Sequence, residues 1–214
     1  LALALMLGWL RGPATLWRNL RTGGRALWLS ALCWATMFTA FMVAITLTDV
    51  ANVLVTMAIA PLLTALVARV ALGHRLPRRT WVAMGVAGLG IVWMYGAKLG
   101  GAEARHWIGT AVALGVPVAA AINWTLLQHL SGRHGDQMPD MLAPVLLGAV
   151  LSAAAMLPLS VPFSASAHDL ALLALLGVVQ LAIPCLLAVR VARVLSAPEI
   201  SLLALLEVLF GVAW

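Results

Sequence analysis

Apolar runs close to twenty residues long make up most of the chain, and short segments that carry most of its charge separate them. A helix needs about 20 apolar residues to cross the hydrocarbon core of a bilayer. The runs therefore predict membrane spans at residues 26–46, 52–72, 80–96, 107–130, 140–160 and 168–190, with a further span beginning near 198. Because the connections are short, neighbouring spans should run antiparallel. The expected fold class is an all-α polytopic membrane protein.

The composition excludes a water-soluble domain. Hydrophobic residues make up 64% of the 214 and charged residues only 9%, whereas about a quarter of the residues of a soluble domain are charged. So few polar side chains cannot cover a body that faces water on all sides. The lipid bilayer is therefore an expected partner of most of the surface.

The cations follow the positions of the predicted loops. The chain carries 13 Lys and Arg residues against seven Asp and Glu, and the cations cluster between the apolar runs. If the first linker is cytoplasmic and the sides alternate, only Lys98 and Arg105 fall outside, as expected from the enrichment of cytoplasmic loops in Lys and Arg. This pattern is typical of membrane orientation rather than of nucleic-acid binding. The loops predicted to be cytoplasmic are 11–25, 73–79, 131–139 and 190–197.

Two segments of the chain align with each other weakly. Residues 46–66 can be laid on residues 193–213 at a displacement of 147, and each segment leads from a basic or polar turn into a long apolar helix. In the predicted topology the first copy runs from outside to inside and the second from inside to outside. Repeats of opposite orientation occur in many secondary transporters, whose substrate site lies between the halves near the midplane of the membrane.

Both segments resemble one known family. The stretch TDVANVLVTMAIAPLLTALVARVALGHRLPRRTWVAMGVAGLGIVWM has a proline in mid-helix, a Leu-Gly turn and a following Gly-rich helix. It resembles the first repeat of the drug/metabolite transporter superfamily, EamA-like branch, and RVLSAPEISLLALLEVLFGVAW resembles the matching part of the second repeat. Two residues depart from the family pattern: His74 stands where Glu is usual, and Val208 stands where Pro usually follows Glu.

The resemblance implies ten helices in two inverted five-helix repeats, of which about seven or eight are present. Residues 1–100 would form the first repeat, truncated at its N-terminal side, and residues 101–214 the second, truncated at its C-terminal side. The opening run LALALMLGWL is only ten residues long, which is too short for a span, and reads as the tail of a cut helix. The chain is thus expected to be a fragment that lacks the first helix and the last.

The resemblance also implies a function. It predicts a secondary transporter, an exporter of small organic solutes such as amino acids or related metabolites, working by alternating access in a bacterial-type plasma (inner) membrane. The alternative is a non-transporting membrane subunit or partner-binding protein. No enzyme is expected, because the sequence contains no HExxH, GxSxG or Walker A pattern. No cofactor or metal is expected either, and Cys33 and Cys185 read as small buried hydrophobes.

Glu207 is the candidate site residue that the sequence marks most clearly. It follows Pro198 by nine residues, which puts it roughly 13 Å into the membrane at 1.5 Å per helical residue. A carboxylate at that depth should face a cavity or a partner, or be protonated. It is therefore either a substrate or proton site between the repeats or a buried, hydrogen-bonded carboxyl that packs the helices. Proton coupling through Glu207 is a further hypothesis.

Other polar and aromatic groups at membrane depth complete the candidate set. Amides can hydrogen-bond a polar solute or join helices, and a Trp ring offers a flat face to an aromatic or cationic one. Prolines inside helices permit kinks and local unwinding. The predicted substrate-binding residues are Trp34, Asn123, Trp124, Gln180 and Glu207, and the predicted gating or kink residues are Pro61 and Pro184.

Overall fold

A computed structural model describes residues 24–73, 81–82, 85–86, 88–90, 93, 104–134, 142–161, 166–192 and 194–213, with side chains except at 133–134, 205 and 207–213. Every regular element in these ranges is helical. The α-helices are α3 (Arg25–Leu47), α4 (Val50–Met57), α5 (Ala60–Leu72), α7 (Ala104–His134), α8 (Leu142–Met156), α9 (Ala167–Leu176), α10 (Ile183–Val191) and α11 (Ala197–Ala213). A 3₁₀ turn, η2 (Leu157–Ser160), follows α8, and a π-helical segment, η3 (Gly177–Ala182), joins α9 to α10.

Five helical segments are long and apolar enough to cross a membrane, namely Arg25–Leu47, Val50–Leu72, Ala104–Gly132, Leu142–Ser160 and Ala167–Val191. They coincide with five of the spans predicted from hydropathy, to within three residues at each end. The predicted span at 80–96 lies mostly outside the described residues, and α11 begins one residue before the predicted start of the last span. The all-α polytopic fold class is confirmed.

The second of these segments is two helices rather than one. The helical pattern is interrupted at Ala58 and Ile59, where α4 ends and α5 begins. Pro61 is thereby the second residue of α5, in the first turn of a helix, where a missing N–H removes no helical hydrogen bond. The structure thus contains a break in the helix just before Pro61 rather than a kink centred on this proline.

The last of the five segments also changes its helical form. The N–H of Ile183 donates to the carbonyl of Val178, five residues earlier, at the end of the π segment. Pro184 follows at the second position of α10 and has no N–H to give to the preceding turn. A π turn widens the helix and is one way to accommodate such a residue.

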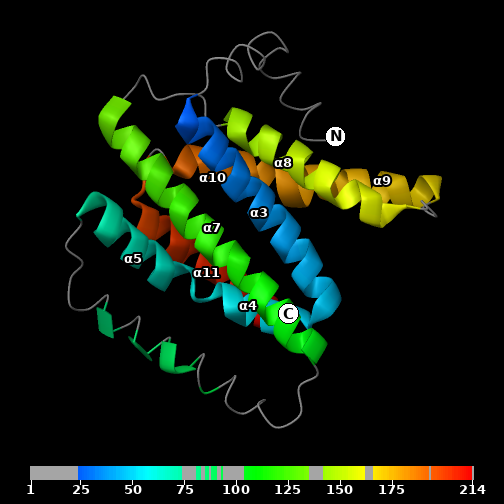
Figure 1. Ribbon diagram of the computed structural model, residues 1–214, viewed down its shortest axis with the longest axis horizontal. Coiled ribbons are helices and arrows are strands. Elements are labelled where there is room, and N and C mark those ends of the chain that lie inside the picture. Colours follow the sequence, from blue (N-terminus) through cyan, green and yellow to red (C-terminus); the bar gives the residue numbers. More distant parts are fainter. Residues whose placement is uncertain are drawn as a thin grey trace.

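Helices α3, α7 and α8 form the most closely packed part of the molecule, and α3 and α7 lie side by side along most of the length of α3 (Figure 1). A Cβ atom added to Gly148 of α8 would lie 2.5 Å from the Cβ of Trp34 and 2.8 Å from the carbonyl oxygen of Ala31. A Cβ at Gly109 of α7 would lie 2.9 Å from the Cβ of Leu47. Glycine is needed at both positions because the helices approach almost to backbone contact, as small residues permit in membrane bundles.

Hydrogen bonds between side chains join the same three helices. The hydroxyl of Ser30 on α3 donates to Oδ1 of Asn123 on α7 at 2.7 Å, and both residues are fully buried. Thr39 on α3 donates to Ser152 on α8 at 2.8 Å. Such bonds between polar side chains hold membrane helices together.

A small polar cluster ties the α3–α4 corner to the start of α7. The Thr48 hydroxyl lies 2.8 Å from Nδ1 of His106, and Nδ2 of Asn52 donates to the Thr110 hydroxyl at 2.8 Å. The guanidinium of Arg105 also donates to the carbonyl of Thr46 at 2.7 Å. These contacts bring the end of α3 and the beginning of α7 to the same side, as the alternating topology requires.

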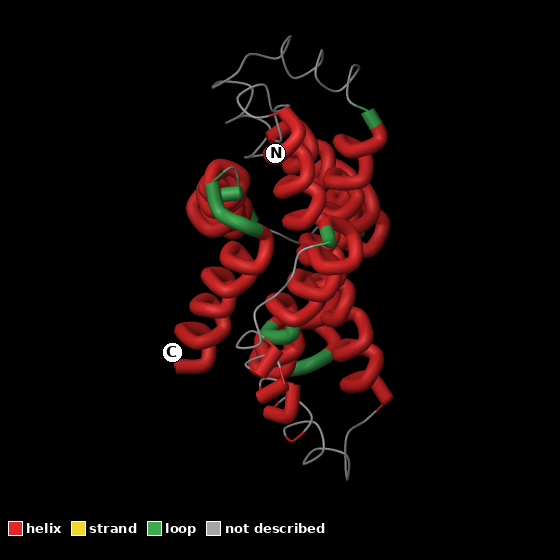
Figure 2. The backbone as a smooth tube through the Cα atoms, turned by 90° about the vertical axis from the view of Figure 1, so that its left-hand side faces the viewer, coloured by secondary structure: helices red, strands yellow, loops and turns green. Residues whose placement is uncertain are grey.

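Helix α11 leaves the end of α10 and runs along one side of the other helices to the C-terminal end (Figure 2). Its start is capped twice: the side chain of Glu199 accepts from the N–H and hydroxyl of Ser196, and Oε1 of Gln128 accepts from the N–H of Ala197 at 3.0 Å. Carboxylates and amides at this position satisfy the first free N–H groups of a helix. α11 packs mainly on α4, α5 and α7, so the two segments that align in the sequence are neighbours in the fold.

Candidate functional site

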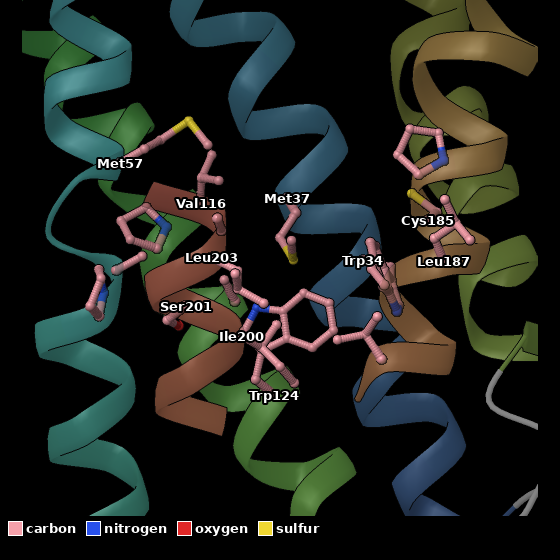
Figure 3. A pocket seen from close by; sticks show the side chains of 18 residues that line it. Trp34, Met37, Met57, Val116, Trp124, Cys185, Leu187, Ile200, Ser201 and Leu203 are labelled. Atoms are coloured by element: carbon pink, nitrogen blue, oxygen red, sulfur yellow. The ribbon is translucent and has the colours of Figure 1, made fainter. Parts of the chain in front are cut away.

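A cavity of about 360 Å³ lies between the helices (Figure 3). Residues from α3, α4, α5, α7, α10 and α11 form its walls, so the parts of the chain before and after residue 100 both contribute. Its volume is within the range of roughly 300–1,000 Å³ that ligand pockets occupy. The described residues that line it are Trp34, Met37, Met57, Ala60, Pro61, Val116, Pro117, Ala120, Trp124, Pro184, Cys185, Leu187, Ala188, Val191, Ile200, Ser201, Leu203 and Ala204.

On three of the membrane spans the residues that line the cavity stand near mid-span, and on α10 the lining extends to its last residue, Val191. Trp34 stands close to the centre of α3, and Pro61 stands at the centre of the span Val50–Leu72. Pro117 and Trp124 stand in the interior of α7, well away from both of its ends.

Two tryptophans form one corner of the cavity. The ring centroids of Trp34 and Trp124 are 5.7 Å apart and their planes meet at 89°, the edge-to-face arrangement that aromatic pairs favour. In Figure 3 the Trp124 ring lies between Ile200 and Trp34, with Met37 above it. Gly148 on α8 packs against the Cβ of Trp34, so the contact between α3 and α8 sets the position from which the Trp34 ring extends.

The walls of the cavity are almost entirely apolar. None of the described lining residues is charged, and Ser201 is the one among them with a hydroxyl group. That hydroxyl lies 2.6 Å from the Thr64 hydroxyl in a buried hydrogen bond between α11 and α5. The indole Nε1 of Trp34 is buried without a hydrogen-bond partner among the described residues. The free hydrogen-bonding capacity of these walls is therefore small.

Four of the residues singled out from the sequence line this cavity. Trp34 and Trp124 are 3% and 6% exposed, and Pro61 and Pro184 stand on opposite sides, on α5 and α10. Asn123 is fully buried but joins α7 to α3 through Ser30, which corresponds to the packing alternative stated for the amides.

The other two predicted residues are not among the described lining residues. Gln180 is exposed on the π segment and is not among the described lining residues. Glu207 belongs to α11, and its side chain lies outside the described residues. Its backbone position follows those of Leu203 and Ala204, which line the cavity, by four and three residues.

Sequence reasoning missed several lining residues. Pro117 was visible as a proline inside a predicted span, and that signal could have placed it beside Pro61 and Pro184. Met37 and Met57 carry no comparable signal, because an apolar residue in an apolar helix is equally compatible with packing, lipid contact and a cavity. Cys185 is buried as expected, and it also contributes to the cavity wall.

Within the described ranges, no group of three or more His, Cys, Asp or Glu side chains is arranged to hold a metal ion. The candidate site is thus characterised by shape and apolar contact, and in its described part by few polar groups.

Comparison with known proteins finds one family that is similar to the first part of the chain. The sequence model of the EamA-like transporter family matches residues 1–96. No curated protein and no solved structure matches the chain. The match agrees with an all-helical, multi-pass membrane architecture. Residues 1–96 of the chain are therefore similar to the EamA-like transporter family, whose members are membrane transporters of the drug/metabolite type.

Proposed function

We propose that the protein is a secondary transporter that moves a small organic solute across the membrane by alternating access around the central cavity. The observation that carries this proposal is the cavity itself: it is large enough for a small ligand, reaches mid-span on three of the spans, and is bounded by helices from both parts of the chain. Secondary transporters with inverted repeats have their substrate sites at this depth, at the interface of the repeats.

The packing of α11 supports an organisation in two repeats, residues 1–100 and 101–214. The aligned segments 46–66 and 193–213 belong to elements that touch each other, since α11 packs on both α4 and α5. Elements related by a two-fold axis in the membrane plane can touch only where they are close to that axis. At the displacement of 147, Thr64 corresponds to residue 211 and Ser201 to residue 54, so the proposed axis passes between the Thr64–Ser201 contact and the equivalent positions 54 and 211.

The helix interruptions support alternating access. The break at Ala58 and Ile59 adjoins the lining residues Met57, Ala60 and Pro61, and the π segment adjoins the lining residue Pro184. Non-helical or wide turns at membrane depth are tolerated where they are buried in protein or border a cavity. Helix segments on either side of such a turn can change their relative angle, which a cavity that opens to alternate sides requires.

We propose Glu207 as the ionisable group that couples transport to protons. The helical repeat places its backbone on the side of α11 that carries Leu203 and Ala204, and a carboxyl at this depth is costly unless it has a function or a partner. In full-length protein, Glu207→Gln should abolish or uncouple transport. Wild-type flux with wild-type pH dependence in this variant would remove Glu207 from the mechanism.

We place the protein in a bacterial-type inner membrane with the loops 11–25, 73–79, 131–139 and 190–197 in the cytoplasm, on the basis of their Lys and Arg content. A cysteine introduced as Gly101→Cys should react with a membrane-impermeant maleimide in intact cells, and one introduced as Gly135→Cys should react only after permeabilisation. The reverse pattern would invert the proposed topology.

Counterflow in proteoliposomes tests the transport function itself. Vesicles loaded with an unlabelled amino acid mixture should accumulate labelled members of that mixture transiently, and vesicles with Ala204→Phe, which fills the cavity, should not. Solutes that leave faster than they enter would support export. Absence of counterflow by folded, reconstituted protein would favour the alternative, a non-transporting membrane subunit.

A further inference from the structure

We infer that the central cavity selects its solute through an apolar or aromatic side group and discriminates against a polar side group of the same size. This inference rests on the proposed transport function and narrows its substrate class. It concerns the part of the solute that contacts the corner formed by Trp34, Trp124 and Met37.

The first argument is the scarcity of polar partners in the described walls, where the indole Nε1 of Trp34 is a buried donor without a partner among the described residues. No described lining residue is charged, and the Ser201 hydroxyl already has a partner in Thr64. A polar group that leaves water must find new hydrogen bonds, or binding is weakened. An amide or carboxylate on the side group would find few here, whereas an apolar group loses nothing.

The second argument is the geometry of the aromatic corner. With the planes of Trp34 and Trp124 at 89°, one ring presents its edge and the other its face. A further ring can pack against such a pair in either of the two favourable aromatic arrangements, offset-stacked or edge-to-face. The corner is therefore suited to a planar apolar group as well as to an aliphatic one.

The third argument concerns the shape of the remaining walls. Met37 and Met57 are flexible, polarisable side chains that adapt to ligands of different outline. Ala60, Ala120 and Ala204 leave room around them. A cavity of about 360 Å³ with these walls fits one ring or one branched chain, so size limits the side group while its exact outline matters less.

Competition in counterflow tests this inference with a series of solutes that share one charged part. L-methionine and L-glutamine have side chains of similar length, and both carry the same ammonium and carboxylate groups, so their difference isolates side-group polarity. We expect methionine and L-phenylalanine to compete at least tenfold more strongly than glutamine. Equal or stronger competition by glutamine, glutamate or lysine would overturn the inference.

Two variants at one position identify the corner as the source of selectivity. The measured quantity is the ratio of competition by phenylalanine to competition by methionine. Trp124→Leu should reduce this ratio at least fivefold. Trp124→Phe should retain the ratio, because phenylalanine keeps an aromatic face at this position. The matched control is Trp107→Phe at the start of α7. Trp107 is not among the described residues that line the cavity, so this variant should leave the ratio unchanged. An unchanged ratio in Trp124→Leu would also overturn the inference.

Alkylation of Cys185 separates a failure of the inference from a failure of the proposed function. Cys185 lines the cavity, so a bound solute should slow its reaction with N-ethylmaleimide in a Cys33→Ser background. If polar solutes protect Cys185 and exchange as strongly as methionine does, the transport function stands and only the apolar selectivity is overturned. Neither protection nor exchange by any solute of the series would overturn both.

Discussion

The two sides of the cavity are built differently. One side consists of α3 and α7, with α8 behind them, and these are continuous helices held together by close backbone approach and buried hydrogen bonds. The second group of wall helices consists of α4 and α5 on one flank of the cavity, α10 on the opposite flank, and α11, and it contains both helix interruptions. We call them the continuous side and the interrupted side.

The difference separates two roles within one cavity. The continuous side sets the position of Trp34 through Gly148, because no side chain can be inserted between α3 and α8 at that level. On the interrupted side, residues that line the cavity lie next to the break at Ala58 and Ile59 or next to the π-helical segment η3. Motion that opens the cavity should therefore arise on the interrupted side, while the aromatic corner keeps its shape.

The largest expected effect is on the continuous side, at Gly148. Gly148→Ala places a Cβ within 2.5 Å of Trp34 and 2.8 Å of a backbone oxygen, and overpacking of this kind costs about 1–3 kcal/mol or more. Gly132→Ala is the matched control, because nothing lies within 4 Å of a Cβ at that position. Thermal unfolding in detergent should show a clear loss of stability for Gly148→Ala alone; equal midpoints for both variants would contradict the close approach.

A smaller loss of stability is expected at Asn123. Asn123→Leu removes the 2.7 Å hydrogen bond and leaves the buried Ser30 hydroxyl without its acceptor, which costs about 1–3 kcal/mol for a buried polar group. Ser30→Ala combined with Asn123→Leu should recover part of that loss, because no unpaired group then remains. If the double variant is no more stable than Asn123→Leu, the bond does not account for the effect.

On the interrupted side, Pro184→Ala should change rate rather than stability. Alanine restores an N–H at the end of the π segment, so an ordinary α-helical turn becomes accessible there. We expect a severalfold slower counterflow with a melting temperature equal to or above that of the parent protein. Pro158→Ala, in the exposed 3₁₀ turn after α8, is the matched control and should leave the rate unchanged.

The smallest expected effect is at the contact between α5 and α11. A double-mutant cycle of Thr64→Val and Ser201→Ala measures the coupling of the two hydroxyls, which are 2.6 Å apart. Hydrogen bonds between membrane helices average about 0.6 kcal/mol in such cycles. A coupling energy of zero would show that α11 is held against α5 by packing alone.

Much of the fold could be predicted because the bilayer imposes a simple rule on the sequence. Span length and hydropathy located five helices that the structure contains, and the Ser196 and Gln128 contacts at the start of α11 agree with a helix that begins next to a predicted loop. The sequence predicted that Pro61 and Pro184 permit kinks or local unwinding. It did not predict whether the helix breaks or forms a π turn at each proline, because that depends on the neighbouring turns.

The candidate site could be predicted only in part. Trp34 and Trp124 were named because a Trp ring at membrane depth offers a flat face to a solute, and both line the cavity. Asn123 was named because its amide could hydrogen-bond a solute, and in the structure it joins α7 to α3 instead. Met57 and Cys185 were missed because nothing in their own chemistry separates a cavity wall from a helix contact.

The sequence alone determined that the chain crosses a membrane several times, where most crossings lie, and which few polar groups are placed inside the bilayer, because each of these depends on local hydropathy and on the cost of unpaired polar groups in lipid. Only the tertiary structure decided which face of each helix borders the cavity. A helix that is apolar on all sides has no amphipathic stripe to mark its inner face, so that face is set by the fit of one helix against another, as at Gly148 and Trp34.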